Sequence, residues 1–408
     1  MESLVSRAQK VDGLELFRKE SWQKLQTLDT EFRFVSLREL YASSFDIQEI
    51  PPLDKKEVVS AIFPECKHSH LIFVNGIFSS ELSDISALPS SLVLAPFEEA
   101  FSTHGTFLEQ ALHRAIQEET DPFALLNLAI QRQGVLLYVP PKLNIEVPLQ
   151  CLYVETGSAP HVFSPRLHLV LGAHTQLRCI ATSHSLNDSF SHLNIPVTDY
   201  LLEEGARLEI QDTVSSAWCM ASLRASLKRQ AHLSFVRLTR GSFSCRQSLR
   251  VYLKGEGAET TLKGLSLLSG SHASHIQATV VHEAPHTRST QLFKGLLEGT
   301  SRFSFSGKIV VDPIAQKTEA YQLHKSLLLS PHARVHSQPN LEIGADDVKA
   351  SHGATIAELE GESLFYLQTR GLDKNTAKKL LIQGFCEEIF HAITSNSLLD
   401  SFKTSGGT

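Results

Sequence analysis

Residues 282–333 read HEAPHTRSTQLFKGLLEGTSRFSFSGKIVVDPIAQKTEAYQLHKSLLLSPHA, and this stretch decides the fold of the chain. Short apolar runs such as SRFSFSGKIVV (301–311) alternate with turns of small and polar residues. No run shows the 3.6-residue period of a long amphipathic helix. Short runs bounded by such turns are typical of β-strands, so the stretch predicts several strands in succession.

The same pattern extends from Val135 to about Leu341, with runs such as VLLYV, LHLVL, RLEI, LSFVRL and LRVYL. Alanines recur at the turns, and the steps between them are 33, 25 and 27 residues for Ala173, Ala206, Ala231 and Ala258. Irregular spacing with small residues at corners suits a solenoid, in which each coil buries its apolar face against its neighbours. A β-sandwich could contain the same strands, so the pattern alone leaves both folds open.

Residues 1–134 are expected to form a helical and mixed N-terminal region. The pattern predicts helix up to about Ser43, and the Pro51-Pro52 pair then interrupts it. A second helix is expected in DPFALLNLAIQRQG (121–134), capped by Asp121 and ended by Gly134. The apolar positions of the first helical segment are Leu14, Leu16, Phe17, Trp22, Leu25 and Leu28.

Residues 135–345 are expected to form the β-rich core, and residues 346–408 a C-terminal helical domain. After Val348 the pattern predicts helix, first in 362–370 with Gly371 as the stop. Asp373 or Asn375 can cap a further helix. The apolar stripe of this helix consists of Ala377, Leu380, Leu381, Phe385 and Ile389. Such a helix can close the end of a solenoid, bind a partner, or do both with two faces.

Composition predicts a chain that binds neither nucleic acid nor membrane. The 38 basic and 44 acidic side chains of the 408 residues give a net charge of -6, the wrong sign for a nucleic-acid surface. The N-terminal sequence MESLVSRAQKVDGLELF contains no apolar targeting segment, and no window approaches the roughly 18 apolar residues of a membrane span. Six scattered cysteines without a CxxC pair favour a reducing compartment, so a cytoplasmic location is expected.

The sequence contains none of the common catalytic motifs that we considered. The sequence has no GxxxxGK[ST] loop, GxSxG elbow, HExxH helix, GxGxxG turn or EF-hand loop, so we expect a protein that is not an enzyme and does not bind ATP. A carbohydrate-active enzyme built on a β-helix is an alternative. It would need clustered acids for Ca²⁺ beside a basic catalytic residue, and Asp346, Asp347 and Lys349 form too sparse a group.

Several histidine groups invite a metal-site interpretation. Cys66, His68 and His70 would share one face of an extended segment, although a structural role is the expected one. The pairs His272 with His275 and His282 with His286 are expected to lie in turns.

The segment 341–385, LEIGADDVKASHGATIAELEGESLFYLQTRGLDKNTAKKLLIQGF, resembles the C-terminal signature of the SufB/SufD family of iron-sulfur cluster assembly proteins. The resemblance continues through residues 282–333, and LIFVNGIFSSELS (71–83) and ALLNLAIQRQGVLLYVPPKLNIEVPLQ (124–150) are also similar. It implies a right-handed parallel β-helix flanked by N-terminal and C-terminal helical segments. It also implies a scaffold without catalytic activity.

The resemblance implies partners as well. It implies a heterodimer with SufB, sulfur supplied indirectly by a cysteine desulfurase system, and a homodimer as an alternative when SufB is absent. The C-terminal helices would dock the SufC ATPase. The residues expected at that contact are Leu364, Phe365, Tyr366, Arg370, Ala377, Leu380, Leu381 and Phe385.

The resemblance also gives His352 a role. In SufD-like proteins the matching histidine lies at the SufB interface and is implicated in building the cluster, so His352 is the expected iron ligand or proton-transfer group. Family members often read KCSHGA here, whereas this chain has Ala350 in KASHGA. Because a thiolate is missing, SufD is favoured over a SufB-like, cluster-holding scaffold. A cluster is then expected only transiently in the complex, and none is expected to stay bound to the chain alone.

Overall fold

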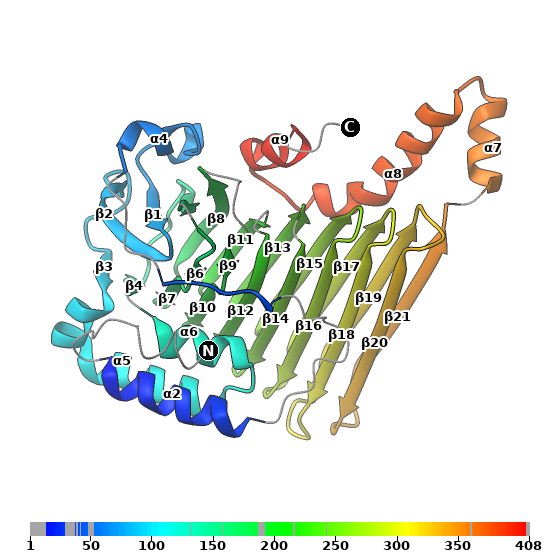
Figure 1. Cartoon of the computed structure of the whole chain (residues 1–408). Coiled ribbons are helices and arrows are strands. Elements are labelled where there is room, and N and C mark those ends of the chain that lie inside the picture. The colour runs from blue at the N-terminus through cyan, green and yellow to red at the C-terminus, as the bar shows by residue number, and fades with distance from the viewer. Residues whose placement is uncertain are drawn as a thin grey trace.

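The chain folds into a parallel β-solenoid of about seven turns with helices at both ends (Figure 1). The computed structural model describes residues 14–28, 37, 40, 42–47, 53–131, 133–157, 159–186, 192–214, 217–241, 243–359 and 361–404. The expected stack of coils is therefore confirmed, and a sandwich is excluded because neighbouring strands inside the stack run parallel.

Two sheets form the walls of the solenoid. The first sheet contains ten strands in the order β2-β1-β5-β8-β11-β13-β15-β17-β19-β21, and the second runs β20-β18-β16-β14-β12-β10-β7-β4-β3 with β6 and β9 beside it. The first-sheet strands are β1 (His70–Val74), β2 (Ile77–Asp84), β5 (Leu149–Glu155), β8 (Gln176–Ser185), β11 (Arg207–Val214), β13 (His232–Arg240), β15 (Glu259–Leu268), β17 (Arg288–Leu297), β19 (Glu319–Leu328) and β21 (Lys349–Glu358). Those of the second are β3 (Val93–Pro96), β4 (Gly134–Val139), β6 (Val162–Phe163), β7 (Arg166–Leu171), β9 (Leu193–Asn194), β10 (Val197–Leu202), β12 (Trp218–Leu227), β14 (Ser244–Leu253), β16 (Ala273–His282), β18 (Arg302–Val311) and β20 (Arg334–Ile343).

The corners of the coils depend on small residues, as the repeat of alanines predicts. Ala206, Ala231 and Ala258 are fully buried at successive corners, where a larger side chain would meet the next coil. Beside them the chain turns through the left-handed region at Gly205 (φ 66°) and Gly257 (φ 69°), a conformation that glycine adopts without strain. Between the corners, alternate residues of each strand point inward and form one continuous apolar core.

The N-terminal end of the solenoid is sealed. Strand β2 pairs antiparallel with β1, and β3 pairs antiparallel with β4, so both sheets end in a reversed strand. The outer face of the second sheet is covered by α5 (Phe97–Glu118) and α6 (Pro122–Ile130), and α2 (Glu15–Thr27) packs on both helices. A short helix, α4 (Lys55–Val59), and the 3₁₀ turn η1 (Pro64–Cys66) lie near β1 and β2.

Helix α6 is fixed to the solenoid by a buried acid. The Asp121 carboxylate caps the helix by accepting from the Phe123 amide, and it also accepts from the Ser222 hydroxyl and from Arg246 at 2.7 Å. Burial alone would raise the pKa of the Asp121 carboxyl, but the charge of Arg246 and the hydrogen bonds outweigh it and hold the pKa below its usual value. The predicted cap is confirmed, whereas the predicted stop is wrong. The helix ends at Ile130, and Gly134 already belongs to β4.

The C-terminal residues depart from the expected pattern at one point. The sequence predicts helix after Val348, but Lys349–Glu358 forms β21 and extends the solenoid by one more strand. The short polar and apolar run KASHGATIAE pairs in register with β19, and this pairing determines its structure. Helices follow only afterwards, as α7 (Gly361–Thr369), α8 (Lys374–Phe390) and α9 (Asn396–Thr404). Asp373 caps α8, as predicted, and Gly371 adopts φ 91° after α7.

Part of the first predicted helical segment lies outside the described residues. Within the described part, Leu14 and Phe17 are buried, whereas Leu16 is exposed, so the apolar face is narrower than the sequence indicates.

Replacing Asp121 by alanine should destabilise the fold by about 3 to 5 kcal/mol, because the buried Arg246 would lose the carboxylate that balances its charge. The contribution should be present above pH 4 and be lost as the pH falls through the lowered pKa of Asp121. Urea unfolding of the variant measures it. Asp347→Ala is the control, since this acid forms an exposed pair with Lys317 and should change stability by less than about 0.5 kcal/mol. Equal effects of the two substitutions would contradict the buried-pair interpretation.

Candidate functional site

The C-terminal end of the solenoid is open. No residue of β20 or β21 is buried, although nearly every earlier strand of the stack contains several buried residues. Two apolar side chains of these strands stay exposed, Ile343 at 43% and Ile356 at 47%. An edge strand presents unpaired backbone N–H and C=O groups, so this end offers both hydrogen bonds and apolar area to another chain.

His352 lies in this open coil. The strands are in register, so Gln291 of β17, Gln322 of β19 and His352 of β21 form one row along the inner face of the first sheet. Gln291 and Gln322 are buried, and the Gln322 amide donates to Gln291 at 3.1 Å. His352 is exposed at the end of the row. It is therefore a side chain of the inward-facing row that the open end leaves accessible.

The interior behind His352 is polar. His324, fully buried on β19, is hydrogen-bonded to Ser337 of β20 at 2.8 Å and to Ser326 at 2.9 Å. Burial lowers the pKa of His324 to about 4 and that of His282 to about 4, so both rings are neutral near pH 7. In register, His282 of β16 occupies the position that Leu253 has in β14, and His324 of β19 the position that Phe293 has in β17.

Helices α8 and α9 attach to the outer face of the first sheet, away from the open end of the solenoid. The Lys294 ammonium, almost fully buried, donates to the Phe385 carbonyl at 2.9 Å and forms an ion pair with Glu388 at 2.7 Å. The same ammonium lies 5.1 Å from the centre of the Phe385 ring. Cys386, Ile389, Ile393, Leu398 and Phe402 continue this apolar contact with the sheet.

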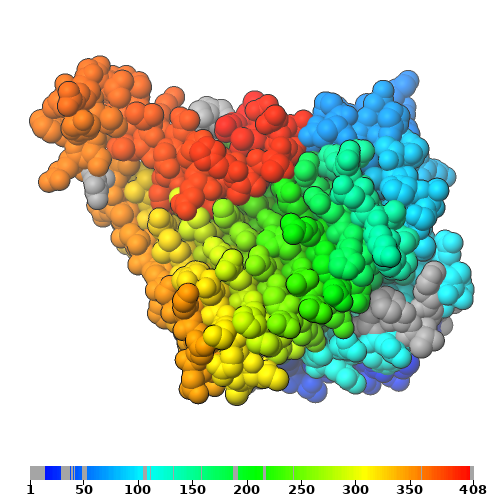
Figure 2. Space-filling view, turned by 180° about the vertical axis from the view of Figure 1, so that it is seen from behind, coloured from blue at the N-terminus to red at the C-terminus, as the bar shows by residue number. Residues whose placement is uncertain are grey.

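Helix α7 and the first part of α8 project from the solenoid. Figure 2 shows α7 and the first part of α8 as a protrusion beyond the stacked coils. No residue of α7 is buried, and Phe365 and Tyr366 are 68% and 57% exposed. Leu380 of α8 is 48% exposed, and Arg370 lies over the Tyr366 ring at 5.1 Å. These four side chains form what we call the helix-tip patch.

The residues expected at the SufC contact differ in how exposed they are. Phe365, Tyr366, Arg370 and Leu380 are exposed, and Leu364 and Leu381 are half-buried. Ala377 is fully buried and is not available to a partner in this conformation, because it packs within the chain itself. Phe385 is half-buried against Lys294, so its ring serves to fix α8 to the solenoid.

The other histidine groups have structural roles. His68 pairs with Asp84 at 3.0 Å, and the buried His70 ring is hydrogen-bonded to the Cys66 carbonyl at 3.0 Å, so their rings do not converge with the Cys66 thiol. The prediction of turns is wrong for His275 and His282, which are buried in β16 and hydrogen-bonded to hydroxyls. In the part of the chain that the structure describes, no group of three or more His, Cys, Asp or Glu side chains could hold a metal ion.

The fold and the open end define a class of protein. A solenoid with one sealed end, one open end and a projecting helical pair has the architecture of a scaffold, because its last strands leave an edge that another chain can pair with. No helix in the described ranges is long and apolar enough to cross a membrane.

Comparison with known protein families identifies the family of this chain. Residues 153–385 match the SufBD core domain of the SUF system for FeS cluster assembly, and residues 8–151 match the SufBD protein N-terminal region. The chain belongs to the SufBD family.

Individual relatives do not separate the two branches of the family. An iron-sulfur cluster assembly SufBD family protein of Synechocystis is 29% identical over 384 residues, which cover 91% of this chain and 84% of the relative. SufD of Escherichia coli is 31% identical, over 39% of this chain and 37% of its own length. SufB of Bacillus subtilis is 22% identical, over 83% of this chain and 74% of its own length.

Sequence reasoning missed two features of this end. The sequence does not indicate the exposure of the last coil, because KASHGATIAE has few apolar residues and the pattern after Val348 predicts helix. The buried Lys294 was also missed. A lysine in the middle of an apolar strand, in FKGLL, is the signal that could have indicated a covered outer face.

The free energy of unfolding should fall as the pH drops from 7 to 5. Because the folded state lowers the pKa of His324 from about 6.5 to about 4, the unfolded chain binds the proton more tightly in this range. His324 alone should contribute roughly 2 kcal/mol of this loss. Urea unfolding at both pH values should show a smaller pH dependence in His324→Gln, while the exposed-site control His332→Gln keeps the wild-type slope. A slope that is unchanged in His324→Gln would contradict this interpretation.

Proposed function

We propose that this chain is a SufD-like scaffold subunit of a SUF complex. It pairs with a SufB-type partner at the open end, docks the SufC ATPase through the helix-tip patch, and carries no catalytic activity of its own. The cluster is cargo built at the interface and is held only transiently. The observation that carries the proposal is the last coil, whose strands β20 and β21 contain no buried residue and which exposes Ile343, Ile356 and His352.

The distribution of cysteines favours the SufD-like role over a SufB-like one. A cluster-holding scaffold needs converging thiolates. No cysteine lies between Cys245 and Cys386, so β16 to β21 contain none. Cys386 is buried against the first sheet, and burial raises the pKa of its thiol to about 11. Soft ligands at the open end would therefore come from the partner, with His352 as the contribution of this chain.

The proposal extends to location and partners. A cytoplasmic site and indirect supply of sulfur from a cysteine desulfurase system accompany the SufD-like role. So does a boundary between the N-terminal region and the core at residue 134, whereas β21 carries the core past residue 345 to Glu358. A homodimer through the same open edge is the alternative assembly when the SufB-type partner is absent. Co-expression with SufB and SufC, followed by mass measurement of the purified complex, tests the assembly. A chain that remains alone under these conditions would contradict it.

The helix-tip patch can be tested separately from folding. The double variant Phe365→Asp with Leu380→Asp should lose at least about 2 kcal/mol of SufC binding, which is roughly thirtyfold in affinity, because both side chains are exposed apolar anchors. Ile314→Asp is the matched control, since Ile314 is also 68% exposed but lies at a coil corner. A titration of each folded variant with SufC provides the measurement. SufC affinity that is unchanged in the double variant would exclude this patch.

His352 can be tested in the assembled complex. His352→Ala should leave the complex intact and reduce cluster formation, because an exposed ligand or proton-transfer group is removed while the packing is kept. His332→Ala, an exposed histidine at the preceding corner, should have no effect. Complex yield, iron and sulfide are measured together. Normal iron and sulfide in the assembled His352→Ala complex would remove this residue from the mechanism.

A cysteine introduced at position 350 distinguishes the two roles further. Ala350→Cys should not restore cluster formation to His352→Ala, because a thiolate does not replace the imidazole in proton transfer. Full recovery in the double variant would instead indicate that any soft ligand at this edge suffices, as in a SufB-like scaffold.

A further inference from the structure

A polar groove lies on the outer face of the first sheet, beside the link that joins α8 to α9 (residues 391–395). Its volume is about 530 Å³, which is within the range of pockets that hold small molecules. The lining comes from three segments: residues 144–146, the strands β8, β11, β13 and β15, and the α8–α9 link. None of these segments belongs to the open end or to the helix-tip patch, so the groove is a separate site.

Both walls of the groove are held in place by hydrogen bonds. On one side, the Ile145 amide donates to the Gln176 carbonyl at 3.0 Å. On the other side, the Thr394 hydroxyl donates to Glu209 at 2.8 Å, and the Thr394 amide donates to the Gln211 side chain at 3.2 Å. The groove is therefore preformed, and a ligand would not have to order these segments when it binds.

The uncompensated charge on the floor of the groove is positive. Three cations, Arg178, Arg207 and Lys263, line it together with two acids, Glu146 and Glu209. The Glu209 carboxylate is already engaged, because it pairs with the Arg178 Nε atom at 3.5 Å and accepts from the link. Neither Arg207 nor Lys263 forms an ion pair with an acid of the described ranges. The remaining acid of the lining, Glu146, is exposed.

The histidines of the lining add little to this charge near pH 7. Burial lowers the pKa of His232, so its ring is neutral there. His391 lies 3.1 Å from the Glu387 carboxylate, which balances the charge of the ring when it is protonated. The attraction for an anion therefore depends on arginine and lysine, whose charges persist at pH 7.5.

Arg207 and Lys263 lie at diagonally opposite positions of the groove floor. Strand β13 separates β11 from β15, so their Cα atoms are about 10 Å apart across the strands. In register, Arg207 is level with Glu259, and Lys263 lies four residues further along β15, about 13 Å away. The two Cα atoms are thus roughly 16 Å apart, and both long side chains can extend toward a ligand between them. A molecule that binds both needs an anionic group at each end.

The floor between these two cations is polar. Ser234 of β13 and Thr261 of β15 are register partners in the row that begins with Arg178 and Glu209. The described residues that line the groove include no Phe, Tyr or Trp. Nucleobases usually stack on such rings, and protein partners usually bind through them, so neither suits this groove. Hydroxyl and amide side chains match a ligand that carries hydroxyl groups of its own.

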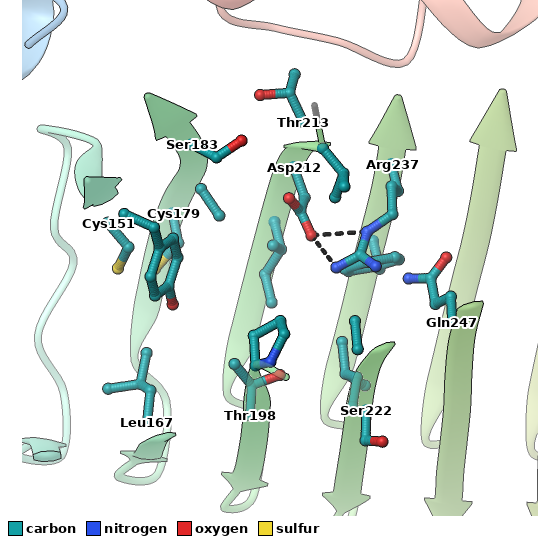
Figure 3. Close-up of a pocket in the computed structure, with 18 of the residues that line it drawn as sticks. Cys151, Leu167, Cys179, Ser183, Thr198, Asp212, Thr213, Ser222, Arg237 and Gln247 are labelled. Atoms are coloured by element: carbon teal, nitrogen blue, oxygen red, sulfur yellow. Dashed lines mark hydrogen bonds and ion pairs between the residues drawn. The ribbon is translucent and has the colours of Figure 1, made fainter. Parts of the chain in front are cut away.

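The interior of the solenoid does not offer an equivalent site. Its cavity has a volume of about 60 Å³, which suits a few water molecules. Figure 3 shows the charged side chains of this cavity, Asp212 and Arg237, directed at each other, and the Arg237 guanidinium donates to Asp212 at 2.8 Å. The charge there is balanced, so an anion would be attracted to the outer groove.

We propose that the outer groove binds a small sugar or polyol that carries an anionic group at each end. One anionic group lies against Arg207 and Arg178, and the other lies against Lys263. The hydroxyl groups between them are hydrogen-bonded to Ser234 and Thr261. Phosphate and carboxylate share this chemistry, because guanidinium and ammonium groups bind both. The site does not depend on the SufD-like role of the chain.

Isothermal titration calorimetry of the full chain at pH 7.5 tests the spacing of the charges. Fructose 1,6-bisphosphate should bind at least about tenfold more tightly than fructose 6-phosphate, because it makes a second charge-assisted contact. Fructose, which has no charge, should show no binding. Glucarate, with a carboxylate at each end, identifies the anionic group, since the tighter of the two dianions has the group that the site prefers.

Single substitutions locate the site on the molecule. Arg207→Gln and Lys263→Gln should each weaken binding of fructose 1,6-bisphosphate by roughly tenfold. Glu146→Gln should strengthen it, because a like charge is removed from the rim of the groove. Arg302→Gln is the matched control, since Arg302 is an exposed arginine of the second sheet and lies outside the groove. Circular dichroism verifies that each variant is folded.

Three results would overturn the proposal. The first is affinity for both dianions that is no higher than affinity for fructose 6-phosphate. The second is wild-type affinity in the folded Arg207→Gln and Lys263→Gln variants. The third is equal weakening in Arg302→Gln, which would show a general attraction of anions to the surface of the protein.

Discussion

Stacking of coils is the constraint on which the rest of this structure depends. A single coil cannot bury its inward-facing residues, so each one relies on the coil before it and the coil after it. The first coils meet this requirement with reversed strands β2 and β3 and with helices α2, α5 and α6. No element in the described ranges covers the last coil in this way. The asymmetry between a sealed end and an open end follows from the order in which strands and covering helices occur along the chain.

Buried polar groups attach the covering helices and also line the coils near the open end. On the outer face, the buried pair of Asp121 and Arg246 fixes α6, and the buried Lys294 ammonium pairs with the exposed Glu388 of α8. In the interior, hydroxyls, amides and neutral histidines replace apolar side chains in the coils near the open end. A partner that extends the stack would meet a row that begins with His352 and continues inward through Gln322 and Gln291.

Most of the fold could be predicted from local patterns, because solenoid strands and their corners are specified by short stretches. The Asp121 and Asp373 caps and the buried corner alanines all match the sequence. The site could be predicted only in part. Whether Leu380 faces solvent and Phe385 faces the solenoid depends on how α8 is anchored by Lys294, a contact 91 residues away in sequence.

The central claim is that the exposed last coil is an interface for a partner chain. Amide hydrogen exchange measures it directly, because unpaired edge amides exchange quickly and an added strand protects them. The account predicts rapid exchange at the outward-directed amides of β20 and β21 in the chain alone, and strong protection of those amides once a SufB-type partner is bound. Exchange in Lys349–Glu358 that is the same with and without the bound partner would contradict the account.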